Sequence, residues 1–122
     1  TPVFGCTQRL SRLIGVGKAK ERVYGARNSK ADEADRLGLV NAVYTQEELM
    51  PAAKKLAAGI AKNAPIAVRN SKKAMNEGLQ VDMDQAIVIE EKVFGDCFET
   101  EDQKEGMTAF LEKRKVDNFK NK

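Results

Sequence analysis

The chain has 122 residues, of which 42% are hydrophobic and 32% charged, and this balance fits one soluble globular domain rather than a disordered segment. Its net charge is only +3, and it contains no histidine, which excludes a Ser-His-Asp or Cys-His catalytic centre built from this chain alone. A Cys/His zinc site is excluded as well, because two cysteines cannot complete one.

Residue patterning excludes further classes of function. No apolar run approaches the roughly 20 residues that a membrane-spanning helix needs. Aromatic residues make up only 6% of the chain, so a base-stacking platform for nucleic acid is not expected. Cys6 and Cys97 lie far apart in the sequence, which indicates free thiols in a reducing compartment. With no signal peptide at the start, the chain is predicted to be cytoplasmic.

The first third of the chain predicts three short helices. Thr7 can cap the first, and Gly15 can end it. The second is expected over residues 18–24. Ser29, with an acidic residue three positions later, forms a capping-box pattern that opens the third helix.

Residues 39–44 form the one strand candidate, because they alternate, are β-branched and lie between turn residues. A single strand leaves its backbone N–H and C=O groups without partners. The chain also begins in a glycine-bearing loop of the kind that follows a strand. We therefore expect the 122 residues to be the back half of a larger enzyme, with the partner strand and the chemistry in the other half.

The remainder predicts four longer helices and a polar tail. Pro51 is expected in the first turn of the first of these helices, since elsewhere it would cost a backbone hydrogen bond. Residues 116–122 are expected to fray. The helix starts are marked by a Thr45/Glu48 capping box, Pro65, Asp82 or Asp84, and a Thr100/Gln103 capping box.

Several of these helices carry apolar stripes that a domain of this size does not cover. The stripes lie around Leu49, Val68 and Phe94. Uncovered apolar stripes imply a partner subunit or the absent half of a larger protein.

Glu90 is the most unusual carboxylate, since it lies between apolar residues of one helix face. It could act as a general base, or it could form a buried or half-buried ion pair with Arg9 or Arg12. We favour the ion pair, because catalytic carboxylates usually come from loops and from the ends of elements.

Two other groups of residues have a functional and a structural interpretation. Phe94 and Phe110 could line an apolar ligand pocket, but on the sequence alone helix–helix core is favoured. Residues 113–115 (Lys-Arg-Lys) could hold a phosphate, although cations at a helix C-terminus also interact favourably with the helix dipole.

Several stretches of the chain follow a familiar order along its whole length. The most specific is Thr-Glu-Asp-Gln-Lys-Glu-Gly-Met-Thr-Ala-Phe at 100–110. The others are Thr1-Pro2, Gly5, Thr7–Leu10, Lys30–Ala34 (Lys-Ala-Asp-Glu-Ala), Gly38–Val40, Ala64–Val68 and Glu112–Lys115. Through these stretches the chain resembles the crotonase family, and within it the enoyl-CoA hydratases and short-chain 3-hydroxybutyryl-CoA dehydratases.

The resemblance implies reversible hydration of a trans-2-enoyl-CoA to the 3-hydroxyacyl-CoA. In the family, two glutamates activate one water and two backbone N–H groups hold the thioester oxyanion. All of these groups lie upstream of the part that this chain matches. We therefore assign no catalytic residue here, expect no cofactor or metal beyond the acyl-CoA substrate, and expect the chain alone to be inactive.

The resemblance also implies supporting residues. Val3 stands where the family usually has glycine and offers its backbone N–H to the catalytic water, while Cys6 replaces another common glycine. Phe94 and Phe110 match aromatic residues of the acyl-pantetheine pocket, and Lys113 matches a lysine that reaches the CoA phosphates. The helices of this region build trimers, usually paired into hexamers.

The predicted fold class is therefore mainly α, the C-terminal helical part of the crotonase α/β spiral with at most one short strand. Residues 1–45 are expected to end the crotonase core, and residues 46–122 to form the helical region for assembly and the CoA pocket. Two alternatives stay open: a stand-alone helical interaction module, or part of a crotonase-family isomerase. Neither nucleic acid nor a membrane is expected as a partner.

Overall fold

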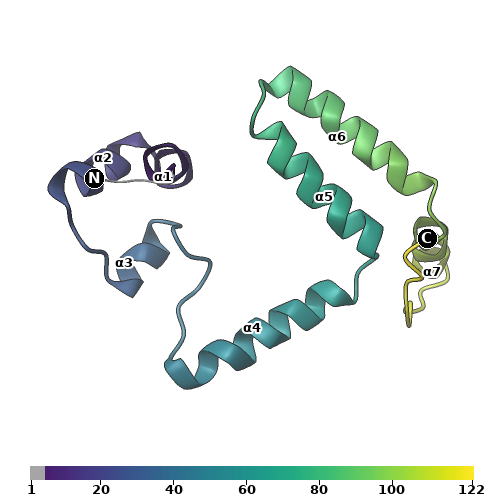
Figure 1. The fold of residues 1–122 in the computed structure, drawn as a ribbon. Helices are drawn as coiled ribbons and strands as arrows, with labels where there is room; N and C mark the ends of the chain where they lie inside the picture. Colours follow the sequence, from purple (N-terminus) through teal and green to yellow (C-terminus); the bar gives the residue numbers. More distant parts are fainter. Residues whose placement is uncertain (1–4) are drawn as a thin grey trace. The chain divides into compact units, whose positions relative to one another are not determined.

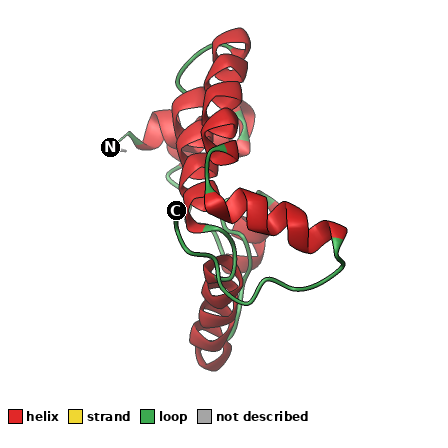
Figure 2. Cartoon of the chain, turned by 90° about the vertical axis from the view of Figure 1, so that its right-hand side faces the viewer, coloured by secondary structure: helices red, strands yellow, loops and turns green. Residues whose placement is uncertain are grey.

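The computed structural model describes residues 5–122, which form seven helices (Figure 1). No strand occurs within this range, and Figure 2 shows only helices joined by loops. The mainly α prediction is therefore confirmed. The helices are α1 (Cys6–Ile14), α2 (Val16–Gly25), α3 (Ala31–Arg36), α4 (Gln46–Ala61), α5 (Pro65–Gly78), α6 (Met83–Phe98) and α7 (Glu101–Leu111).

The chain divides into two compact units, here called unit 1 (to Ala52) and unit 2 (Ala53–Lys122). The division falls inside α4. The predicted boundary between residues 45 and 46, which rests on the family resemblance, stays a prediction.

In unit 1, α1 and α2 pack against each other. Gly5 precedes α1 with φ +75°, and no side chain caps the helix, so the predicted cap by Thr7 is wrong. The helix begins two residues earlier than expected, and Thr7 lies within its first turn. Gly15, with φ +83°, ends α1 as predicted, because this left-handed backbone is readily adopted by glycine.

An ion pair ties α2 to α3. Arg22 contacts Glu33 at 2.6 Å and also donates a hydrogen bond to the hydroxyl of Ser29. The predicted capping box at Ser29 is wrong, since Lys30 precedes α3 and no side chain caps it. The helix ends before Gly38, as expected, and the φ of +70° at this glycine lets the Leu39 N–H return to the Ala34 carbonyl at 2.9 Å.

Residues 39–44 are irregular, so the predicted strand is wrong for this chain. The physical reason is that a strand needs a neighbouring strand whose backbone pairs with its N–H and C=O groups. No described residue supplies that neighbour.

The capping box that opens α4 is confirmed in both directions. The Glu48 N–H donates to the Thr45 hydroxyl at 3.3 Å, and the Glu48 carboxylate accepts from the Thr45 N–H at 3.4 Å. Pro51, however, is the sixth residue of the helix and not part of its first turn. The Glu47 carbonyl therefore lacks the N–H that a residue other than proline would donate.

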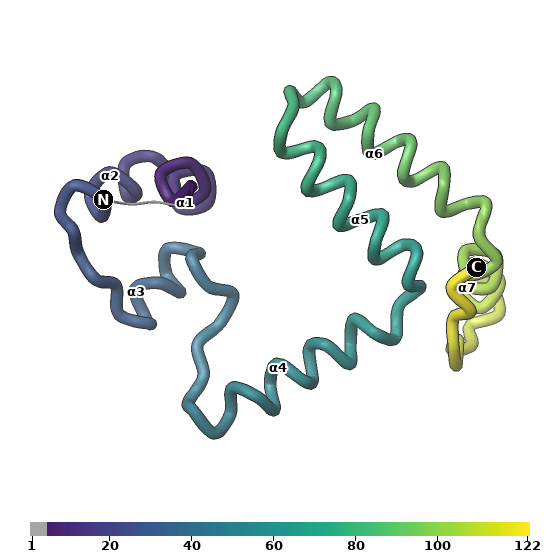
Figure 3. The backbone as a smooth tube through the Cα atoms, viewed as in Figure 1, coloured from purple at the N-terminus to yellow at the C-terminus, as the bar shows by residue number. Residues whose placement is uncertain are grey.

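In unit 2, α5 and α6 form an antiparallel hairpin (Figures 1 and 3). Pro65 starts α5 as predicted. Of the two predicted starts of α6, the structure selects Asp82, whose carboxylate accepts from the Gln85 N–H at 2.9 Å. One side chain links the two helices in their middle. Asn70 on α5 donates to the Val93 carbonyl of α6 at 3.0 Å and to the Cys97 sulfur at 3.4 Å.

Candidate functional site

The four residues that the resemblance predicts to bind acyl-CoA fall in different places. Val3 lies outside the described residues. Phe94 is on α6, Phe110 is on α7 and Lys113 is in the turn after α7.

Phe94 and Phe110 do not form helix–helix core, so that interpretation of the sequence is wrong. Phe94 is 63% exposed and meets Phe98 edge to face, with the ring centroids 5.0 Å apart. Phe110 is 78% exposed, whereas Ala109 beside it is buried. Both rings are therefore available to a ligand or to another protein surface.

Lys113 occupies the turn that ends α7. Its φ is +55°, and its N–H donates to the Phe110 carbonyl at 3.2 Å, while the Arg114 N–H returns to the Ala109 carbonyl at 3.0 Å. These two bonds define a Schellman motif, whose left-handed position is usually glycine. A lysine there pays a conformational cost of about 1–2 kcal/mol.

Arg114, the next residue, is bound by two carboxylates. It contacts Glu105 and Glu112, each at 2.6 Å. The hydrogen bond from Arg114 holds the pKa of the Glu105 carboxyl below its ordinary value of 4.5, and the two carboxylates raise the pKa of Arg114. Of the three consecutive cations, Arg114 thus has a structural role, and Lys113 and Lys115 are exposed without an ion pair in the described part of unit 2.

Residues 112–122, here called the C-terminal strap, fold back along α7 (Figure 3). The expected fraying of residues 116–122 is therefore wrong. The Asp102 carboxylate accepts from the N–H groups of Lys120 at 2.6 Å and Asn121 at 2.8 Å. In return, the Lys122 carbonyl accepts from the Glu101 N–H at 2.8 Å and from that of Asp102 at 3.3 Å.

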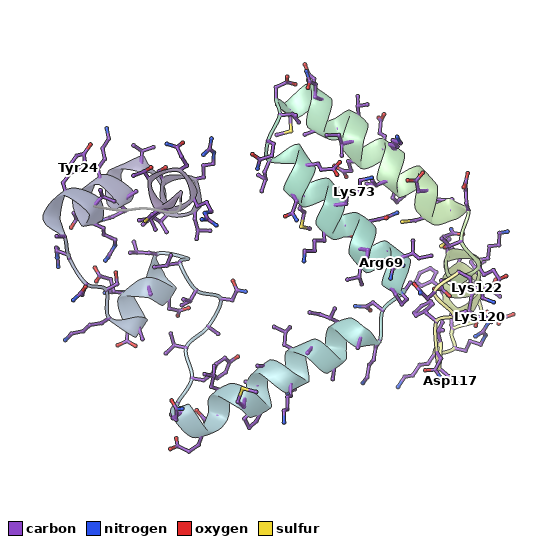
Figure 4. The ribbon with its side chains drawn as sticks, viewed as in Figure 1. Tyr24, Arg69, Lys73, Asp117, Lys120 and Lys122 are labelled. Carbon is purple, nitrogen blue, oxygen red and sulfur yellow. The ribbon has the colours of Figure 1, made fainter. Side chains whose placement is uncertain are left out.

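Two further contacts hold the strap in unit 2. The Arg69 guanidinium of α5 donates to the Asn121 side-chain oxygen at 2.7 Å, and Figure 4 shows Arg69 beside the labelled lysines of the strap. The ring of Phe119 covers Gly106, since a methyl group added to this glycine would lie 3.7 Å from the ring.

Asp102 is the functional candidate that the sequence did not reveal. It is 2% exposed and is the one buried charged residue among those described. A carboxylate in the first turn of a helix interacts favourably with the helix dipole, so the sequence alone offers no reason to expect a tertiary partner for Asp102. The Thr100 hydroxyl caps the same turn by accepting from the Gln103 N–H at 3.1 Å, as predicted.

Glu90 was expected to be a general base or to pair with Arg9 or Arg12, and both roles stay predictions, since those arginines lie in unit 1. It is exposed on α6 and forms no ion pair with the described residues of that unit. The expected burial is therefore wrong, since α6 directs Val93 inward and leaves Glu90 in solvent.

A cavity occurs in each of the two units. The cavity between α1 and α2 has a volume of about 210 Å³, is mostly apolar and lies beside Tyr24 (Figure 4). The cavity between α7 and the strap, of about 450 Å³, is lined by polar residues that include Asp102 and Lys120. No group of three potential metal ligands occurs among residues 5–122, and none of the helices described there could cross a membrane.

Unit 2 leaves many large apolar side chains in solvent. Only Val93 and Ala109 are buried there among the described apolar residues. The exposed ones include Met75, Leu79, Met83, Ile87, Val88, Phe94, Phe98, Met107, Phe110 and Leu111.

Comparison with known proteins identifies the family. The sequence profile described as Enoyl-CoA hydratase/isomerase matches residues 1–122, the full length of the chain. The chain belongs to the enoyl-CoA hydratase/isomerase family. It is similar to the short-chain-enoyl-CoA hydratase of Clostridium acetobutylicum, with 57% identity over 100% of this chain and 47% of that protein. It is similar to the crotonyl-CoA hydratase of Syntrophomonas wolfei, with 59% identity over 98% of this chain and 45% of that protein.

Solved structures give the same result for the fold. An enoyl-CoA hydratase from Bacillus anthracis superimposes with a TM-score of 0.91 and 43% identity, over 97% of this chain and 45% of that one. An enoyl-CoA hydratase from Geobacillus kaustophilus gives a TM-score of 0.93 and 41% identity, over 99% of this chain and 47% of the other. The seven helices are therefore part of the crotonase fold, and the chain spans about half the length of the relatives it matches.

Proposed function

We propose that this chain is the C-terminal portion of an enoyl-CoA hydratase, which adds water reversibly to a trans-2-enoyl-CoA to give the 3-hydroxyacyl-CoA. The observation that carries the proposal is the family match over residues 1–122 together with 57% identity to a short-chain-enoyl-CoA hydratase. The hydratase would act in fatty acid metabolism in the cytoplasm.

The chain itself completes the CoA pocket and carries none of the catalytic glutamates. Phe94 and Phe110 supply exposed aromatic surface to the acyl-pantetheine arm. Lys113 places its ammonium on the CoA phosphates, a role that suits lysine as a point charge. Val3 would offer its backbone N–H to the reacting water. Hydration needs no cofactor besides the acyl-CoA substrate.

Assembly is the second role of the chain. The exposed side chains of α5, α6 and α7 form more apolar surface than a monomer usually leaves in water. Burying one side chain such as Phe110 or Leu111 contributes about 1.5–3 kcal/mol, so a few of them hold subunits together. The proposed assembly is a homotrimer or a pair of trimers.

The test uses the native-length protein that carries this chain. It should hydrate crotonyl-CoA and sediment as a trimer or hexamer, whereas the 122-residue chain alone should show no hydration. Lys113→Ala should raise KM for crotonyl-CoA about tenfold, for the loss of one charge-assisted contact, with kcat nearly unchanged. Lys115→Ala makes the same charge change two residues away and should leave KM as it is.

Three results would contradict this proposal. Shift of a 3-enoyl-CoA double bond with no hydration would make the parent protein an isomerase. Full activity of the 122-residue chain would place catalytic groups inside it. A native protein without acyl-CoA affinity would leave the stand-alone interaction module as its function.

A further inference from the structure

Asp102 holds the C-terminal strap from the start of α7. A buried carboxylate is costly unless strong hydrogen bonds offset its desolvation. Asp102 has two, both from strap backbone N–H groups and both within 2.8 Å. Because the Lys122 carbonyl accepts from the first N–H groups of α7, the contact is reciprocal. The buried carboxylate of Asp102 therefore holds the C-terminal strap against α7.

The strap is fixed at both of its ends. One end leaves α7 through the Schellman turn at Lys113, and the other reaches Asp102 at the opposite end of the helix. The helix between them has 11 residues, a length of about 16 Å. Between the ends, Arg114 binds Glu105 and Phe119 covers Gly106. The turn that carries Lys113 is therefore held from the helix side and from the strap side.

The backbone of Lys113 depends on this support. A non-glycine residue in a left-handed conformation persists when the surrounding structure over-determines it. Lys113 has φ +55°, and glycine would adopt that conformation at little cost. The contacts between the strap and α7 therefore keep the left-handed backbone of Lys113 in place.

We propose that Asp102 is a positioning residue for phosphate recognition: by holding the strap, it fixes the turn that presents the Lys113 ammonium to the phosphates of CoA. This inference rests on the proposed role of Lys113 in the CoA pocket. Asp102 itself is buried and does not touch the ligand. It acts through the strap backbone at Lys120 and Asn121.

The test is a double-mutant cycle in the native-length protein. Asp102→Asn keeps the side-chain shape but replaces one acceptor oxygen with an NH2 donor, so only one strap N–H can be bound. Calorimetry gives the Kd for CoA and for pantetheine, which has no phosphate, in Asp102→Asn, Lys113→Ala and the double variant. Asp117→Asn is the matched control, since it makes the same change at an exposed strap position (Figure 4).

Lys113→Ala is expected to weaken CoA binding about tenfold, as one lost charge-assisted contact does, and Asp102→Asn about three- to tenfold. The double variant should bind no more weakly than Lys113→Ala alone. Pantetheine affinity and the Asp117→Asn control should not change. Hydrogen exchange at the Lys120 and Asn121 amides should accelerate in Asp102→Asn. It should not change in Lys113→Ala or in Asp117→Asn.

The possible failures are distinguishable. Wild-type CoA affinity in Asp102→Asn, with weakened binding in Lys113→Ala, overturns the inference and leaves the proposed function intact. Unchanged CoA affinity in Lys113→Ala overturns the inference together with the proposed contact of Lys113 with the CoA phosphates, while the hydratase proposal is tested separately by the activity on crotonyl-CoA. Losses that multiply in the double variant show that Asp102 acts independently of Lys113. If Asp102→Asn does not fold, Phe119→Ala loosens the strap by removing its contact with Gly106 while the Asp102 carboxylate stays in place, and the same cycle applies.

Discussion

The left-handed backbone of Lys113 at the end of α7 allows the effect of a glycine substitution on stability to be predicted quantitatively. Lys113→Gly should stabilise the last turn, since an L-residue in this conformation costs about 1–2 kcal/mol and glycine avoids that cost. Glycine loses more backbone entropy on folding, by about 0.5–1 kcal/mol, so the net gain should be about 0.5–1 kcal/mol. Lys113→Ala removes the same ammonium group but keeps the strained backbone, and should give no gain.

The reporter is the Arg114 amide, whose N–H donates to the Ala109 carbonyl at 3.0 Å only when the Schellman motif is closed. Its hydrogen exchange, measured by NMR in the native-length protein, should slow about 2–5-fold in Lys113→Gly, the factor for that free energy. Lys115→Gly, where φ is not positive, should show faster exchange instead. Equal or faster exchange in Lys113→Gly than in Lys113→Ala would refute the reasoning.

Three other predictions concern single contacts. Thr45→Ala removes the reciprocal cap with Glu48, and should lower the stability of α4 by about 1 kcal/mol in urea unfolding, with Thr45→Ser retaining most of it. Asn70→Ala deletes the link between α5 and α6 and should cost about 1–2 kcal/mol in the same assay; no loss would mean that solvent replaces it. The lowered pKa of Glu105 means that its contact with Arg114 is complete at neutral pH and is lost only as the pH falls below 4.5; the carboxyl ¹³C shift should titrate there, and closer to 4.5 in Arg114→Gln.

Local signals in the sequence located most of the helices. The caps at Thr45 and Thr100 were predicted correctly, and the cap at Asp82 was one of two predicted alternatives, because each cap joins residues three positions apart. The cap predicted at Ser29 is wrong, because the Ser29 hydroxyl instead accepts a hydrogen bond from the Arg22 guanidinium. Sequence spacing cannot indicate such competition from another helix.

The candidate site could not be predicted from local patterns. Asp102 and its strap partners lie 18 and 19 residues apart, and nothing in the spacing of a polar tail indicates a buried carboxylate. The exposure of Phe94 and Phe110 was missed for a related reason, since a helical apolar stripe does not reveal whether this chain or another covers it. The family resemblance, which carries such long-range information, assigned both rings to a pocket.

The buried positions of this chain have an unusual composition, with consequences for its tolerance to mutation. Among the described residues, the buried apolar side chains are Ala19, Ala34, Val93 and Ala109. Truncation of such residues removes little volume, so the usual damage from cavities is small here. Enlargement is the harmful direction, since extra methylenes in close packing cost about 1–3 kcal/mol. A saturation mutagenesis scan should therefore find these alanines replaceable by glycine or serine more readily than by valine or leucine.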